Sequence, residues 1–141
     1  MTRSEEALKT FVGIKRTNDR LNKAVKVDVK NYGLNVNEFT VLEVLFHRGK
    51  LQVQQIKELI LIANSSTTYI IDKLCQKELV KRVQDKVDRR ITYVDLTDEG
   101  YQLMKESFPK HERTILSLFD RLDDEELVEM KRLLKKMNGH T

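Results

Sequence analysis

Residues 88–100, DRRITYVDLTDEG, decide the fold when they are taken together with the polar run at residues 64–77, NSSTTYIIDKLCQK. Residues 91–96 are rich in β-branched side chains, and residues 79–83 mix apolar with basic ones. Two such runs on either side of a charged turn predict a β-hairpin with arginines near its tip. A helix, a charged hairpin and the start of a second helix are typical of a winged helix-turn-helix.

The residue types of both segments suit duplex DNA. Arginine on a solvated loop fits the narrow, electronegative minor groove, and a helix with small polar side chains fits the major groove. We call the helix expected at residues 64–77 the reading helix. When its residues are placed about 100° apart around the helix axis, an apolar face is separated from a polar one. Thr67, Ile70, Ile71 and Leu74 fall on the apolar face, and Ser65, Tyr69, Asp72 and Gln76 fall opposite. Asp72 would be repelled by phosphate, so it either holds a wing arginine or accepts a hydrogen bond from a cytosine amine.

The hairpin resembles the wing signature of the MarR family of transcriptional regulators, which runs Asp, any residue, Arg, a short strand, Leu-Thr and a later Gly. In this chain the signature is carried by Asp88, Arg90, Leu96, Thr97 and Gly100. A long first helix, the TYIIDKL string and a helical C-terminal pair extend the resemblance over nearly the whole chain. It implies a mainly α-helical fold with a small β-hairpin wing and long N- and C-terminal dimerisation helices.

Glu78 departs from the family pattern, which usually has a Gly that closes the reading helix. Either Glu78 adopts a left-handed backbone, at a cost of about 1 kcal/mol, or the turn is built differently. The other expected helix ends follow local signals. Asn37 is the expected N-cap of a helix that ends at Gly49. Thr97 is the expected N-cap of a helix that runs through Leu122 and is kinked at Pro109.

Length and composition set the organisation. A chain of 141 residues is one domain by length, and the resemblance divides it into a winged-helix DNA-binding part, 34–97, and a helical dimerisation part, 1–33 and 98–141. Basic residues outnumber acids at 73–90, on the reading element, whereas acids prevail from 98 onward. No run is apolar enough for a membrane span, the charged N-terminus is no secretory leader, and one cysteine fits a reducing compartment. A cytoplasmic protein is expected.

Two apolar stripes predict a homodimer. In the helix expected at residues 4–32, the N-terminal end of the stripe, with Leu8 and Phe11, has no neighbour in sequence to cover it. Asp123 and Glu126 resemble a capping box for a last helix. That helix carries a stripe too apolar to face water, Leu127, Met130, Leu133, Leu134 and Met137. In MarR-like proteins the terminal regions of two chains interlock; the alternative is burial within one chain.

The DNA contacts expected from these patterns divide between the two grooves and the backbone. Arg89 or Arg90 is expected in the minor groove. The phosphate backbone is assigned to Gln52 and Gln54, at the start of a support helix, and to Lys77 and Arg82. The major groove is assigned to Ser65, Ser66, Thr68, Tyr69 and Lys73. Two reading heads on a two-fold axis imply a pseudo-palindromic operator with half-sites about one helical turn apart.

Other chemistry receives less support. The segment FPKH at 108–111 and the TYIIDKL string are similar to a branch of the family that responds to quinones and phenols, which suggests a small aromatic effector. Its pocket would be lined by Phe11, Ile14, Phe39, Leu42, Phe46, Phe108 and His111, unless these are plain core. Cys75 is a candidate redox sensor because Lys73 and Lys77 lie nearby. Thiol sensors of this family, however, commonly carry their cysteine in the first helix, where this chain has none.

The sequence therefore predicts a DNA-binding transcriptional regulator, most simply a repressor released by an aromatic effector or by oxidative or electrophile stress. No Cys, His and carboxylate set has metal-site spacing, no cofactor motif is present, and nothing resembles a nucleophile elbow or a phosphate-binding glycine loop, so an enzyme is not expected. The alternative is a protein-interaction module on a winged-helix scaffold that does not read DNA.

Overall fold

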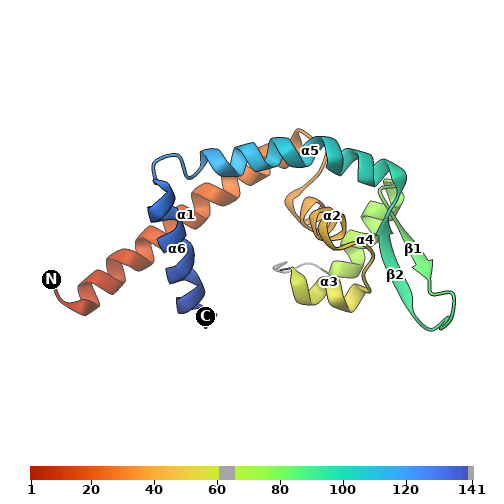
Figure 1. The fold of residues 1–141 in the computed structure, drawn as a ribbon, viewed down its shortest axis with the longest axis horizontal. Coiled ribbons are helices and arrows are strands. Elements are labelled where there is room, and N and C mark those ends of the chain that lie inside the picture. The colour runs from red at the N-terminus through yellow and green to blue at the C-terminus, as the bar shows by residue number, and fades with distance from the viewer. Residues whose placement is uncertain (61–65, 140–141) are drawn as a thin grey trace.

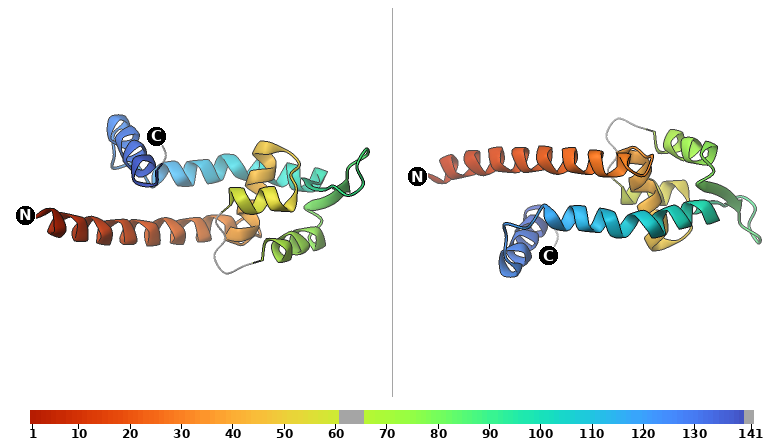
Figure 2. Two further views of the ribbon diagram at one scale, coloured as in Figure 1. Left: turned by 90° about the horizontal axis from the view of Figure 1, so that it is seen from below. Right: turned by 90° about the horizontal axis from the view of Figure 1, so that it is seen from above.

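A computed structural model of the chain describes residues 1–60 and 66–139. Two long helices, α1 (Arg3–Lys30) and α5 (Asp98–Ser117), run side by side and carry α6 (Asp124–Met137) at one end (Figure 1). We call α1, α5 and α6 the arm. The reading head at the other end comprises α2 (Val36–Arg48), α3 (Val53–Leu59), α4 (Thr67–Gln76), β1 (Val80–Gln84) and β2 (Thr92–Leu96). The N-terminus and α6 lie far from the wing in all views (Figure 2). The predicted winged helix-turn-helix is confirmed.

The wing is a two-stranded antiparallel hairpin anchored to the reading head by a third segment. Val80 pairs with Leu96 at the base of the hairpin, and Gln84 pairs with Thr92 near the tip. Leu51, just before α3, exchanges both backbone hydrogen bonds with Val94, at 3.0 and 2.7 Å. The base of the wing therefore cannot move independently of the loop between α2 and α3.

The core occupies the reading head and the adjoining ends of α1 and α5. It holds Val29 of α1, Met104 of α5 and, between them, apolar side chains from all elements of the reading head. By contrast, α6 has no buried residue, and large apolar side chains of the N-terminal part of α1 are exposed. Within residues 1–60 and 66–139, no helix is both long and apolar enough to cross a membrane.

Several helix ends differ from the sequence expectations. The N-cap of α2 is Asn35, not Asn37, because the Asn35 and Glu38 side chains each bind the backbone N–H of the other. The reading helix α4 begins at Thr67 with Ser66 as its N-cap, and the expected start near Asn64 lies outside the described residues. Helix α5 continues through Pro109 but stops at Ser117, not Leu122, where the Arg20 guanidinium binds the Leu118 carbonyl at 2.6 Å. The predicted capping box of Asp123 and Glu126 at the start of α6 is confirmed.

The backbone of Glu78 decides between the two ways in which the reading helix could end without glycine. Its φ is 62°, so it occupies the left-handed region, and the alternative of a different turn is wrong. The N–H of Glu78 binds the Cys75 carbonyl at 2.9 Å, and that of Leu79 binds the Leu74 carbonyl at 3.0 Å. These are the two hydrogen bonds of a Schellman motif. The geometry usually given by Gly is therefore kept, with the backbone strain that a side chain brings.

Thr97 and Gly100 bring the start of α5 onto this same turn. The Thr97 hydroxyl donates to the Glu78 carbonyl at 2.7 Å and accepts from the Gly100 N–H at 3.0 Å, so the predicted N-cap is confirmed. The Thr97 N–H binds the Leu79 carbonyl at 3.1 Å. A Cβ on Gly100 would lie 2.0 Å from that same carbonyl oxygen. Only glycine allows α5 to approach the turn so closely.

Gly100→Ala is therefore expected to destabilise the fold by about 1 to 3 kcal/mol, because the start of α5 must move off the turn. Gly13→Ala is the matched control, since nothing lies within 4 Å of a Cβ at this helical position. The control should gain about 0.5 to 1 kcal/mol from helix propensity. Urea denaturation of both variants checks the expectation; equal stability of Gly100→Ala and the wild type would show that the close approach can relax.

Candidate nucleic-acid interface

The reading helix α4 turns its polar face away from the core, as predicted. Ile70, Ile71 and Leu74 are buried with Thr67, whereas Tyr69 is 59% exposed. Thr68, Asp72, Lys73 and Gln76 are exposed as well, and Ser65 lies outside the described residues. The Ser66 hydroxyl accepts from the Tyr69 N–H at 3.4 Å. The Lys73 ammonium stands 5.5 Å from the centre of the Tyr69 ring, within cation–π range. The outward face thus presents an aromatic ring, hydroxyls and a cation.

The tip of the wing is organised by two carboxylates. Asp85 accepts from the backbone N–H groups of Asp88, at 2.8 Å, and Val87, at 3.1 Å, and these hydrogen bonds lower the pKa of Asp85. Asp88 binds Arg90 through Nε and Nη2, both at 3.0 Å, and its Oδ1 also accepts from the Arg90 N–H. This pairing lowers the pKa of Asp88 and raises that of Arg90. The Asp-x-Arg spacing therefore fixes the direction of an arginine whose side chain is 90% exposed.

Arg89 and Gln84 contact each other near the same tip. The Gln84 side-chain amide donates to the Arg89 carbonyl at 2.6 Å. The Arg89 side chain is exposed, so both predicted minor-groove arginines project from the hairpin end.

Arg82 connects the wing to the reading helix. Its Nη2 lies 2.6 Å from Oδ1 of Asp72, and its Nη1 donates to the Cys75 sulfur at 3.5 Å. Of the two roles open to Asp72, the structure thus supports the pairing with a wing arginine. The guanidinium of Arg82 is engaged within the protein, while its assignment to the DNA backbone stays a prediction. Cys75 is half-buried beside it, and its redox role likewise stays a prediction.

Lys77 reaches from the end of α4 to α2, while its own side chain stays 42% exposed. Its ammonium lies 2.8 and 2.9 Å from the two carboxylate oxygens of Glu38 and 3.3 Å from the Gly33 carbonyl. The Glu38 side chain is only 5% exposed, so it requires a cation. Charge and position in sequence alone predict a DNA-backbone contact for Lys77. The geometry favours a structural role, which the sequence does not reveal because Glu38 lies 39 residues away.

The support helix α3 contributes residues near the reading helix. Gln52 is its N-cap, and the Gln52 N–H is bound by the Gln55 side chain at 2.8 Å. Gln54 lies in its first turn and contacts Glu58 at 3.5 Å. Both glutamines stand at the start of a helix, and their contact to the phosphate backbone stays a prediction.

The predicted effector pocket is divided by the structure. Phe11 and Ile14 lie on the exposed N-terminal part of α1, whereas Phe39 and Leu42 are buried in the reading head. Aromatic contacts join Phe39, Phe46, Phe108 and His111. The centres of Phe39 and His111 lie 4.5 Å apart, and those of Phe46 and Phe108 lie 6.0 Å apart. The sequence groups all seven residues because helical periodicity does not tell which turns of two long helices meet.

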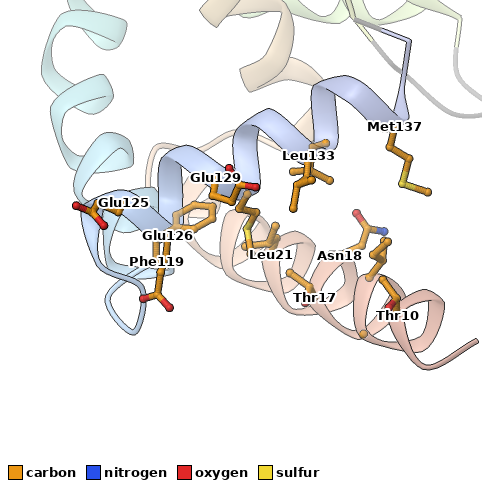
Figure 3. Close-up of a pocket in the computed structure, with 14 residues that line it drawn as sticks. Thr10, Thr17, Asn18, Leu21, Phe119, Glu125, Glu126, Glu129, Leu133 and Met137 are labelled. Atoms are coloured by element: carbon orange, nitrogen blue, oxygen red, sulfur yellow. The ribbon is translucent and has the colours of Figure 1, made fainter. Parts of the chain in front are cut away.

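An apolar groove lies between α1 and α6 instead. It has a volume of about 870 Å³, and α6 crosses α1 there with Leu133 and Met137 directed toward α1 (Figure 3). The groove joins the two predicted apolar stripes; its apolar lining comprises Ile14, Leu21, Phe119, Met130, Leu133, Leu134 and Met137. Most of these stripes therefore stay uncovered within one chain.

Asp28 is a buried carboxylate that sequence analysis missed. It accepts from the Tyr32 hydroxyl at 2.5 Å, the Thr114 hydroxyl at 3.1 Å and Nδ1 of His111 at 2.8 Å. Burial, followed by the hydrogen bond to Asp28, raises the pKa of Tyr32. In sequence Asp28 resembles exposed acids of the same helix such as Asp19. Tyr32 is a neighbour in sequence, but His111 and Thr114 belong to a helix more than 80 residues away.

Comparison with known proteins agrees with this geometry. The model described as MarR family matches residues 34–92. The HTH-type transcriptional regulator MhqR of Bacillus subtilis is 37% identical over 95% of this chain and 92% of its own length. PecS of Dickeya dadantii, an HTH-type transcriptional regulator, is 32% identical over 85% of this chain and 74% of its own.

Solved structures share the fold. A point mutant of MarR from E. coli, complexed with operator DNA, has a TM-score of 0.82 at 19% identity and covers 97% of this chain and 99% of its own. BpsR of Bordetella bronchiseptica, whose DNA binding is regulated by 6-hydroxynicotinic acid, has a TM-score of 0.80 at 25% identity, with 92% and 98% coverage.

Replacing Lys77 by Met should lower the stability of the protein by about 1 to 3 kcal/mol, because the Glu38 carboxylate loses its cation while staying buried. Lys73→Met is the control, since Lys73 is exposed on the same helix and contacts a ring, not a carboxylate. Chemical denaturation distinguishes the two. Wild-type stability of Lys77→Met would restore Lys77 as a candidate DNA contact.

Proposed function

The chain belongs to the MarR family of DNA-binding transcriptional regulators, and we propose that it acts as a homodimeric repressor of a pseudo-palindromic operator. In this proposal residues 34–97 form the DNA-binding part, and residues 1–33 and 98–141 form the dimerisation part. The single observation that carries it is the joined surface of α4 and the wing. Arg82 and Asp72 connect the two elements, while Tyr69 and Arg90 project outward from them.

The two elements suit different parts of the duplex. The exposed face of α4, with Ser66, Thr68, Tyr69 and Lys73, has the donors and acceptors that base edges in the major groove require. Arg90, oriented by Asp88, is suited to the minor groove beside it, because an arginine held in place loses little entropy on binding. As a regulator of a bacterial-type operator, the protein would act in the cytoplasm, and its relatives, all regulators, give no reason to assign it an enzymatic role.

The dimer is supported by the uncovered apolar surface of the arm. The stripes of α1 and α6 and the groove between them would be buried by a second copy, which gives the two reading heads a two-fold axis. Each fully buried Leu contributes about 1.5 to 3 kcal/mol, so such an interface is strong enough for a stable dimer.

Release by a small aromatic effector is supported by two likenesses. The TYIIDKL and FPKH segments resemble the quinone- and phenol-responsive branch of the family, and BpsR, which is 25% identical, responds to 6-hydroxynicotinic acid. Electrophile or oxidative stress acting on Cys75 is the second route. Benzoquinone adds to a thiolate without a further oxidant, whereas hydroquinone does not. Loss of operator binding with each compound, compared between the wild type and Cys75→Ser, therefore separates non-covalent release from thiol chemistry.

Selection of bound sequences from a random duplex pool tests the main proposal. It should return a two-fold symmetric motif whose affinity falls steeply with salt, with a slope of about −0.9 per phosphate neutralised. A protein-interaction module would enrich no motif and show no such slope. Tyr69→Ala should alter the enriched motif, because the ring faces the expected base edges.

Arg90→Ala is expected to weaken operator binding by about 1 to 3 kcal/mol without changing stability, because the guanidinium is exposed and its only described partner is Asp88. Arg132→Ala is the matched control, as Arg132 forms a similar exposed pair with Glu129 at 2.6 Å on α6. Fluorescence anisotropy at fixed salt measures both. Equal dissociation constants for the two variants would contradict the assignment of Arg90 to the minor groove.

Leu127→Glu combined with Leu134→Glu should abolish the dimer, because two charges would be buried in the stripe of α6. Operator affinity should then collapse, since a single reading head loses the effective concentration supplied by its twin. Lys136→Glu, on the same helix, controls for a change of charge alone. A folded double variant that still sediments as a dimer would place the interface elsewhere.

A further inference from the structure

A buried polar cluster links α1 to α5 within the arm, at the place where both helices meet α2 of the reading head. Asp28 of α1 is 6% exposed and His111 of α5 is 8% exposed. The carboxylate and Nδ1 of the imidazole are 2.8 Å apart, while Tyr32 and Thr114 donate to the other carboxylate oxygen. Neither the reading face nor the groove between α1 and α6 includes these side chains, and the likeness of the FPKH segment assigns no contact to the His111 ring.

The second nitrogen of His111 faces another carboxylate. Nε2 lies 3.6 Å from Oε2 of Glu43 on α2, a separation within ion-pair range but longer than a hydrogen bond. Carboxylates accept hydrogen bonds and do not donate them. A neutral imidazole that donates to Asp28 therefore turns a lone pair toward Glu43. The imidazolium, with two N–H groups, can donate to both.

We propose that His111 is a positioning residue for DNA binding, and that its proton-dependent link to Glu43 fixes the angle between arm and reading head. Proton uptake closes the link from α5 to α2, while Asp28 holds the same ring to α1. A fixed angle sets the spacing of the two reading heads in advance and so reduces the entropy lost on operator binding. This effect on the operator rests on the proposed function, whereas the link itself does not.

The surroundings of His111 keep the ring in place for this role. Phe39 of α2 packs with its ring centre 4.5 Å away, and Phe108 lies 6.2 Å away on α5. The charged and titratable groups around the ring are Asp28 of α1, Tyr32 in the turn after α1, and Glu43 of α2. Arg113 of α5 acts electrostatically on Tyr32. The raised pKa of Tyr32 keeps its hydroxyl protonated, so it continues to donate to Asp28.

Thermal unfolding tests the link without DNA. If Glu43 binds the protonated ring in the folded state, the stabilisation is present at low pH and is lost as the pH rises. The difference in Tm between the wild type and Glu43→Gln should therefore be about 2 to 4 °C larger at about pH 6 than at about pH 8. Glu43 is partly exposed, so the variant should fold. His47→Gln is the matched control, because His47 also lies on α2 but packs against Phe46 and Phe108.

Operator binding tests the consequence. Between about pH 8 and 6 the wild type should gain about fivefold in affinity for the selected operator relative to a scrambled duplex. Glu43→Gln and His111→Gln should lose this gain, and His47→Gln should keep it. The gain in affinity at low pH should also be smaller on an operator with one base pair inserted between its half-sites. If His111 had a merely structural role, the insertion would change the affinity by the same factor at both pH values.

Each outcome decides a different claim. The same pH dependence of Tm in the wild type and Glu43→Gln would overturn the link. A pH-dependent Tm difference with no pH-dependent operator affinity would overturn the role in DNA binding. Failure to bind any duplex specifically at either pH would reject the proposed function, and the unfolding comparison would still decide whether the link exists.

Discussion

The contact between the start of α5 and the turn after α4 orients the other elements of the molecule. The Leu79 carbonyl accepts from the Thr97 N–H and lies where any side chain on Gly100 would have to sit. Since α4 ends and the wing begins at this turn, the reading helix, the wing and the arm all take their directions from it. Glu78 keeps the left-handed geometry of the turn even without glycine. The surrounding hydrogen bonds therefore determine the backbone here more strongly than local preference does.

Opposite charges divide the basic residues of the reading head into two groups. Lys77 and Arg82 are drawn to carboxylates of the same chain, Glu38 and Asp72, and they hold elements together. Arg90 is also paired, but with a near neighbour at the wing tip, so its pair orients the side chain toward solvent. The basic excess of residues 73–90 is thus only partly available to DNA. Charge alone indicates the candidate interface but does not tell which basic side chains are free to contact a duplex.

The arm and the reading head meet through polar as well as apolar contacts. A core of Val29, Leu42 and Met104 would hold the helices together at many similar angles, because apolar contacts have little directionality. The hydrogen bonds of Asp28 are directional and buried, and they fix α1 against α5 within the arm. Within this cluster only the 3.6 Å approach of His111 to Glu43 reaches α2 of the reading head, so it is the polar contact that can select an angle. A regulator with two reading heads needs such selection, since a small change of angle at each joint alters the distance between the heads.

The amino-acid sequence is sufficient to predict the winged-helix class, the faces of α4, the capping box of α6 and the N-cap at Thr97, because these follow from periodicity and from residues within one turn of each other. It also contains the Asp88 and Arg90 pair, whose members are two positions apart. The folded chain was needed to find the partners of Glu38, Asp28 and Lys77, the separation of Phe11 from Phe39, and the stop of α5 at Ser117. Each of these depends on contacts between elements distant in sequence. Local propensity cannot encode which turns of two helices lie opposite each other once the chain has folded.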